Sequence, residues 1–176
     1  MNNIMILTDE YFGIKPLPLN NPRIRYGARG IVLNDEKNVA VFYKENKLEY
    51  KLPGGGIEQG ENPELAFKRE VQEETGCEVE IIKQLGLFEE HRNTDNFKQI
   101  SYVYVAKVIN DTKELNLTQK EIDEGAKLLW VDEDKALKLI SSSFNNVIAS
   151  KYDNVYNINF IVIRDREIMK YYLANK

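Results

Sequence analysis

Cysteine and histidine are nearly absent from the sequence, which has one of each among its 176 residues, Cys77 and His91. A lone cysteine cannot form an intrachain disulfide, and it cannot supply a four-cysteine zinc site or a CxxC pair. The sequence also lacks an apolar run long enough to span a membrane, and its first ten residues, MNNIMILTDE, have no basic flank typical of a signal sequence. These absences predict a cytoplasmic protein without a membrane partner.

An excess of positive charge is missing as well, because 28 acidic side chains outnumber 24 basic ones and give a net charge of −4. Such a chain has no general attraction for a nucleic-acid polymer or an anionic surface. A small phosphate-bearing ligand would therefore have to be held by a few local groups. The length and the apolar content of 43% suit one domain over residues 1–176.

The order of apolar runs and turn residues predicts an α+β protein. Strands are expected at residues 28–33, 39–43, 48–52, 79–88, 97–109 and 128–131, and the first two of them form a hairpin. Helices are expected at residues 63–75, 133–140 and 165–173, the last of them after an apolar segment at residues 156–163. Strands and helices do not alternate strictly, which favours a layered domain with a mixed sheet over a doubly wound one.

The helix expected at residues 63–75 carries the stretch KREVQEETG, which is rich in like charge. Glu70, Glu73 and Glu74 are separated by three and four residues, so their side chains share one helix face. Close carboxylates repel one another, and a hard divalent cation such as Mg²⁺ or Mn²⁺ relieves that repulsion. A solvated acidic face is the alternative interpretation. Against it, the residues four positions from Glu70 are Ala66 and Glu74 rather than lysines.

A loop of three glycines, residues 54–56, comes shortly before this helix, and together the two segments resemble a known motif. From Gly55 the sequence reads GGIEQGENPELAFKREVQEETGC, which is similar to the Nudix box. The positions that match the box are Gly55, Glu61, Arg69, Glu70, Val71, Glu73, Glu74 and Gly76. Cys77 departs from the pattern, because it stands where an aliphatic residue is usual, although a buried thiol behaves as a small hydrophobe.

The resemblance to Nudix hydrolases implies an α/β/α sandwich with a mixed sheet, and hydrolysis of a nucleoside diphosphate linked to another group. It implies that Mg²⁺, or alternatively Mn²⁺, is bound by the Gly54 carbonyl and by Glu70, Glu73 and Glu74. Glu70 or Glu73 would also help to activate water. Arg69 would orient a glutamate through a charge-assisted bond, with Glu61 as a plausible partner of that arginine.

A further catalytic carboxylate is expected from a later loop, as in several members of the family. Glu121, Asp123 and Glu124 stand at a suitable distance before Trp130. Of these three, we favour Glu124. The alternative is that all three are solvent-facing charges.

The substrate is suggested by elimination. Family subgroups carry a proline or a tyrosine shortly after the box, for ADP-ribose and for dinucleoside polyphosphates respectively. Here that window, residues 92–95, reads RNTD, and no proline follows Pro63. What remains is a MutT-type hydrolase that converts a nucleoside triphosphate to the monophosphate. The alternatives are a hydrolase of ADP-ribose or another nucleotide sugar and a nucleotide-sensing module without catalysis. A homodimer, common in the family, is also left open.

Five other residues have two interpretations each. His91 suits acid–base chemistry, but a lone loop histidine is more often solvated. Arg25 and Arg29 flank the first strand and could bind a phosphate, although both also fit an ordinary surface role. Tyr102 and Tyr104 share a strand face and could stack on a base, and core packing explains them equally well.

Overall fold

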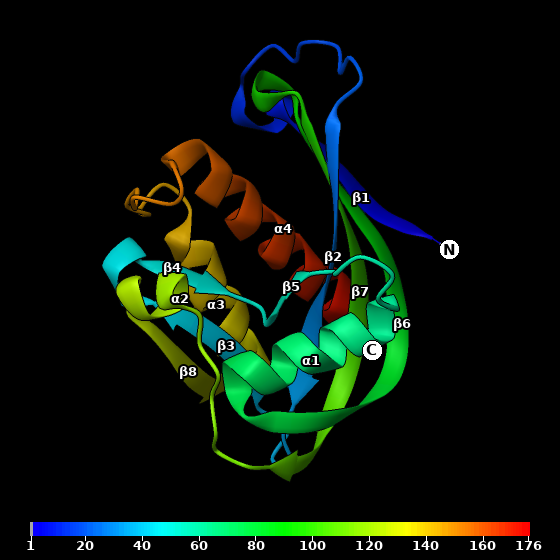
Figure 1. Ribbon diagram of the computed structural model, residues 1–176, viewed down its shortest axis with the longest axis vertical. Helices are drawn as coiled ribbons and strands as arrows, with labels where there is room; N and C mark the ends of the chain where they lie inside the picture. Colours follow the sequence, from blue (N-terminus) through cyan, green and yellow to red (C-terminus); the bar gives the residue numbers. More distant parts are fainter. Residues whose placement is uncertain (1) are drawn as a thin grey trace.

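A mixed sheet organises the computed structural model, which describes residues 2–176 (Figure 1). The strands run in the order β1-β6-β7-β2-β3-β4, with β5 paired to β2 and β8 paired to β3. Pairs β1/β6 and β2/β7 are parallel and the other pairs are antiparallel. The strands are β1 Asn3–Thr8, β2 Arg23–Leu33, β3 Val39–Lys44, β4 Glu49–Lys51, β5 Gly54–Gly56, β6 Cys77–Arg92, β7 Phe97–Asp111 and β8 Ala126–Val131.

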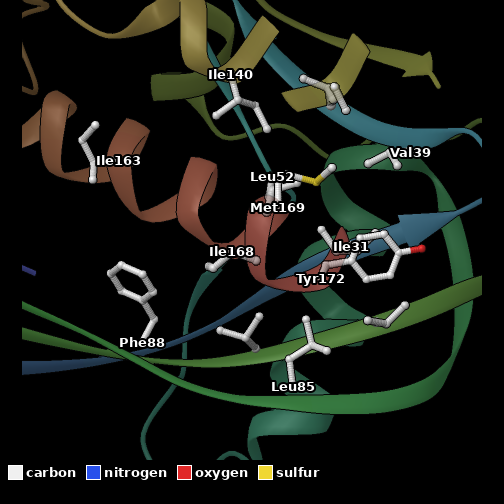
Figure 2. Packing of buried hydrophobic residues seen from close by; sticks show 14 of the residues in the cluster. Ile31, Val39, Leu52, Leu85, Phe88, Ile140, Ile163, Ile168, Met169 and Tyr172 are labelled. Carbon is white, nitrogen blue, oxygen red and sulfur yellow. The ribbon is translucent and has the colours of Figure 1, made fainter. Parts of the chain in front are cut away.

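Helices cover both faces of the sheet and bury a separate apolar core on each. They are α1 Pro63–Thr75, α2 Gln119–Asp123, α3 Glu133–Ser143 and α4 Val155–Ala174. Successive residues of one strand point to opposite faces. On β7, accordingly, Val103 packs in the core with α3 and α4, whereas Tyr104 packs in the core with α1. Figure 2 shows the first of these cores, with Met169 of α4 next to Leu52. The expected α+β sandwich with a mixed sheet is confirmed.

Helix α1 has the bounds that its sequence predicts. The Asn62 side chain accepts a hydrogen bond from the backbone N–H of Glu64, and Gly76 ends the helix at φ 71°. This left-handed conformation favours glycine. Phe67 and Val71 are fully buried against the sheet. One face of α1 is therefore fixed in the core, and the glutamates lie towards the other.

The C-terminal helix corrects one expectation. Instead of an apolar segment followed by a helix at residues 165–173, a single helix, α4, runs over Val155–Ala174. The side chain of Asn154 caps it, and Arg164 and Asp165 form an ion pair with Nε and Oδ1 2.7 Å apart, both side chains buried. These paired charges interrupt the apolar pattern in the sequence without interrupting the helix. Within residues 2–176, no helix has the length and apolar character needed to cross a bilayer.

Three further elements were not expected, namely β1, β5 and α2. Strand β1 pairs in parallel with β6, far from it in the sequence. The three glycines expected to form a loop instead form strand β5, which pairs with β2. The short helix α2 begins with a capping box between Thr118 and Glu121.

Candidate active site

The three glycines of β5 bring the backbone against helix α1. Glycines 54, 55 and 56 pair with Arg29, Ala28 and Gly27 of β2. A β-carbon added at Gly55 would lie 2.2 Å from Oε2 of Glu70, and Gly54 has a φ of 135°. Only glycine fits both positions, because a side chain would displace Glu70 at the first and strain the backbone at the second.

Glu74 and Gly54 surround the ammonium group of Lys51. The Glu74 side chain is 2% exposed, and its Oε2 accepts a hydrogen bond from the Gly54 N–H at 2.8 Å. Lys51 Nζ lies 3.0 Å from Glu74 Oε1 and 3.4 Å from the Gly54 carbonyl oxygen. Burial raises the pKa of Glu74, and the Lys51 charge opposes that shift. A cation thus stands between two of the oxygen groups expected to bind metal.

Arg69 connects the remaining glutamates of the box. Its Nε and Nη2 donate to the two carboxylate oxygens of Glu61, both at 2.9 Å. Its Nη1 donates to Glu70 at 2.9 Å and to Glu73 at 3.4 Å. The Arg69 hydrogen bonds lower the pKa of Glu61 to about 2, whereas burial and the Glu70 charge raise the pKa of Glu73. Arg69 thus contacts Glu61, its plausible partner from the sequence, and also contacts Glu70 and Glu73.

The chemistry of these groups fits a hard divalent cation, although the carboxylates are engaged with basic side chains. Within residues 2–176, no three His, Cys, Asp or Glu side chains converge closely enough to form a metal site by themselves. The reason is visible in the contacts, since Lys51 holds Glu74 and Arg69 holds Glu70. An oxygen-only donor set of carboxylates and one carbonyl suits Mg²⁺ or Mn²⁺, which usually keep water or phosphate oxygens as further ligands.

A cavity of about 300 Å³ opens in front of the glycines. Gly54, Glu70 and Glu74 lie in its wall. The fourth expected metal ligand, Glu73, does not line this cavity and faces a neighbouring hollow together with Arg69. The structure therefore brings three of the four expected ligands to one cavity and connects the fourth through Arg69.

Glu121 rather than Glu124 reaches the cavity from the segment before Trp130. Glu121, in α2, lines the cavity and raises the pKa of Glu74 by charge repulsion. Glu124 is 2% exposed and is held by Lys44 Nζ at 2.6 Å and Lys47 Nζ at 3.4 Å. Although burial opposes it, the Lys44 contact lowers the pKa of Glu124. The catalytic role of Glu124 stays a prediction, and its carboxylate is already paired twice.

Four arginines and a glutamine form the other end of the cavity, which we call the arginine end: Arg25, Arg29, Arg92, Arg164 and Gln99. Arg25 is exposed at the surface, whereas Arg29 is 4% exposed, so the surface interpretation of Arg29 is wrong. Sequence reasoning missed Arg92, Gln99 and Arg164. For Arg164 a signal exists, because a charge within a long apolar helix has to be paired.

The remaining candidates lie away from the cavity. Tyr104 is 2% exposed and packs on Phe67, with ring centroids 5.4 Å apart, and Tyr102 packs against the same core. The core interpretation of both tyrosines is therefore the one that the structure supports. The imidazole Nε2 of His91 lies 3.0 Å from Glu89 Oε2 on β6, outside the cavity wall.

Comparisons with known proteins agree with this arrangement. A family model described as the NUDIX domain matches residues 24–150. A human diphosphoinositol polyphosphate phosphohydrolase is 34% identical over 92 residues, 52% of this chain and 48% of that protein. A rat diphosphoinositol polyphosphate phosphohydrolase 2 is 36% identical over the same shares. The chain thus spans about half the length of the curated relatives it matches. A solved NUDIX hydrolase from Nitrosomonas europaea has a TM-score of 0.61 at 14% identity, covering 88% of this chain and 91% of that one, and shows the fold alone.

Proposed function

The chain belongs to the NUDIX domain family, and from this premise we propose that it is an enzyme that hydrolyses a phosphoanhydride bond of a small molecule. The curated relatives support a substrate that carries a diphosphate group, since their names describe phosphohydrolases of diphosphorylated molecules. We also propose a cytoplasmic location, because a single buried thiol suits a reducing compartment.

One observation carries the proposal, namely the Lys51 ammonium group, which lies between Glu74 and the Gly54 carbonyl in the cavity that Glu70 also lines. Lys51 shows that this corner of the cavity accommodates positive charge against two oxygen groups. Backbone and carboxylate oxygens next to a glycine turn are the ligands by which Mg²⁺ approaches a phosphate. The site therefore has the chemistry that phosphoryl transfer needs.

The roles of the residues follow from their contacts. We propose that the Gly54 carbonyl, Glu70, Glu73 and Glu74 hold Mg²⁺ or Mn²⁺. Such an ion, when bound, offsets phosphate charge and lowers the pKa of water. Arg69 fixes the orientation of Glu70 and Glu73 through its fork of donors. Glu70 or Glu73 accepts the proton of the attacking water.

The further acidic group is proposed to be Glu121 in place of Glu124. Glu121 lies in the cavity wall, where its charge acts on Glu73 and Glu74. The two lysine contacts of Glu124 fit a supporting role for the loop that carries Glu121. The variants Glu121→Gln and Glu124→Gln separate the two assignments. Loss of the catalytic carboxylate lowers kcat without lowering folding stability, whereas loss of a supporting carboxylate lowers the stability as well.

Two substrate classes are proposed. A nucleoside triphosphate, hydrolysed to the monophosphate, follows from the elimination of other family markers in residues 92–95. A densely phosphorylated molecule bearing a diphosphate follows from the names of the relatives and from the basic residues in the cavity wall.

A substrate panel with product identification tests the proposal. Nucleoside triphosphates, ADP-ribose, a UDP-sugar and a diphosphoinositol polyphosphate are incubated with Mg²⁺ or Mn²⁺, and the products are identified by phosphorus NMR. We expect turnover of at least one compound, and Glu70→Gln and Glu73→Gln lower it by roughly a hundredfold or more. Glu64→Gln, at an exposed position of the same helix, is the matched control.

Two results contradict the proposal. Unchanged turnover in Glu70→Gln and Glu73→Gln would mean that these carboxylates do not take part in catalysis. If the protein binds a nucleotide tightly but forms no product with either Mg²⁺ or Mn²⁺, it is a nucleotide-sensing module and not an enzyme. Gel filtration of the same preparation tests the homodimer that the family resemblance leaves open.

A further inference from the structure

Two arginines beside the glycine loop lack an acidic partner. Arg29 is 4% exposed, and its Nε donates to the hydroxyl of Ser101 at 3.1 Å. Among residues 2–176, no carboxylate forms an ion pair with Arg29 or Arg25. A buried guanidinium without a counter-ion is unfavourable, because it loses hydration that nothing replaces.

The surroundings of Arg29 add to the positive charge. Glu90 pairs with Arg92 at 2.8 Å and with Arg164 at 3.1 Å, and Asp165 pairs with Arg164 at 2.7 Å. Four guanidinium groups therefore meet two carboxylates, which leaves an excess of two positive charges. Burial and the Arg164 charge lower the pKa of Arg29 to about 9. The arginine end of the cavity therefore carries a net positive charge.

Hydrogen-bond donors at the same place lack acceptors. Within residues 2–176, Nε2 of Gln99 and Nε of Arg92 are buried without a partner. A β-carbon built on Gly27 would lie 2.8 Å from Gln99 Nε2 and 2.8 Å from Arg29 Nη2, so these two donors point at one small region. Buried donors nearly always have an acceptor. Gln99, Arg92 and Arg29 all line the cavity, where a ligand can supply one.

Neighbouring glycines of β5 approach Arg25 and the Glu70 carboxylate of the proposed metal site. Gly56 pairs with Gly27, and a β-carbon on Gly56 would lie 2.9 Å from Arg25 Nη2. The next glycine, Gly55, faces the Glu70 carboxylate. Arg25 and Glu70 nevertheless line the same cavity, so a ligand in it with phosphates at both places would contact both groups. This arrangement separates an anion-binding part of the cavity from a cation-binding part.

We propose that Arg25, Arg29 and Gln99 bind a phosphate group of the substrate that lies outside the scissile diphosphate. The forked donors of arginine match the oxygens of a phosphate, and the Gln99 amide adds a further donor. The inference rests on the proposed function, and it selects a substrate with an additional phosphate over a diphosphate joined to a neutral sugar. Arg164, which keeps this end positive, comes from α4, beyond the residues that match the family model.

Phosphate binding without metal tests the site directly. Inorganic phosphate is titrated into the full chain in EDTA by calorimetry, which removes any contribution of a divalent ion. We expect Arg25→Gln and Arg29→Met to weaken phosphate binding by about tenfold or more, because each removes a charge-assisted contact. Arg23→Gln is the matched control, since Arg23 lies on the same strand over the Phe97 ring and outside the cavity wall.

Thermal unfolding of the same variants separates a binding role from a structural one. Arg29→Met is expected to raise Tm, because it removes a buried charge that has no counter-ion. A structural arginine would instead give a lower Tm. Arg25 is exposed, so Arg25→Gln keeps the binding test valid if Arg29→Met folds poorly.

Steady-state kinetics identify the source of the phosphate. For a substrate with an additional phosphate, Arg25→Gln is expected to raise KM about tenfold with kcat little changed, whereas KM for a UDP-sugar stays the same. Equal phosphate affinity in wild type, Arg25→Gln and Arg29→Met overturns the inference. The inference is also overturned if the arginine variants weaken phosphate binding but leave KM unchanged. In that case the site binds free phosphate and not a phosphate group of the substrate. Absence of turnover with intact phosphate binding counts against the proposed function alone.

Discussion

Lys51 places an ammonium group where the metal ion is expected, between two of its proposed ligands. Its contacts with Glu74 and the Gly54 carbonyl mean that a divalent ion has to displace it from both groups. The resemblance to the box was enough to name Gly54 and Glu74 as expected ligands. It could not predict Lys51 as their partner, because the lysine lies outside the box and meets Glu74 only after folding.

Replacement of this lysine should strengthen metal binding. We expect Lys51→Met to bind Mn²⁺ about tenfold more tightly, since roughly one charge interaction of 1–2 kcal/mol no longer opposes the ion. Titration monitored by electron paramagnetic resonance measures the free Mn²⁺. Lys68→Met removes the same charge from an exposed position of α1 and serves as the control. Weaker Mn²⁺ binding in Lys51→Met would show that the lysine helps to build the site.

Arg69 is the second residue with a distinctive contact set, and its geometry depends on the shape of the guanidinium. It holds both oxygens of Glu61 and also reaches Glu70 and Glu73. Lysine keeps the charge but cannot form these parallel bonds. We expect Arg69→Lys to lower kcat/KM by roughly 10–100-fold, as loss of a group that orients metal ligands usually does. Unchanged kcat/KM with weaker thermal stability would restrict Arg69 to a structural role.

At the scale of single elements, local signals decide what the sequence can predict. The ends of α1 were predictable because Asn62 and Gly76 act on their own neighbours along the chain. The start of α4 was not predictable, because the charged residues Arg164 and Asp165 resemble the end of an apolar segment unless their partners are known. Those partners are far away in the sequence, since Asp165 accepts a hydrogen bond from the Leu52 N–H at 2.9 Å.

The attachment of α4 to β6 depends on Glu90 and gives a prediction about stability. Glu90 is fully buried between Arg92 and Arg164. We expect Glu90→Gln to lower the free energy of unfolding by about 3–5 kcal/mol, because Arg164 and Arg92 lose a buried counter-ion. Denaturation in urea measures the change. Glu80→Gln, at an exposed position of the same strand, should leave stability nearly unchanged.

The same contact predicts a pH dependence. Burial opposes ionisation of Glu90, but Arg164 and Arg92 outweigh it and lower its pKa from 4.5 to about 2 in the folded protein. A carboxylate with a lowered pKa stabilises the fold above its unfolded pKa, and the contribution is lost as pH falls towards the folded value. Stability should therefore decline between about pH 4.5 and pH 2, and Glu90→Gln should flatten that decline. An equally steep decline in the variant would assign the effect to other carboxylates.

At the scale of the whole molecule, the cavity joins segments that are far apart in the chain. Glu70 comes from the box and Gly54 directly precedes it, whereas Glu121 comes from α2 and Arg164 from α4. The box was predictable because its spacing is local. The opposite wall depends on the parallel pairing of β2 with β7, which sets Arg29 beside Val103 and Arg25 beside Gln99, and no local pattern specifies that register.

Linkage between metal binding and folding tests the assembled site as a unit. A ligand that binds only the folded chain adds about 2.7 kcal/mol of stability at a concentration of about 100 Kd, so Tm should rise when Mg²⁺ or Mn²⁺ is added. We expect Glu70→Gln and Glu74→Gln to lose most of that rise, whatever their own Tm in EDTA. Calorimetric scans with and without the ion, at constant ionic strength, measure the difference for each protein. An equal rise in wild type and both variants would place the ion elsewhere on the molecule, and the carboxylates beside Gly54 would then owe their burial to Lys51 and Arg69 alone.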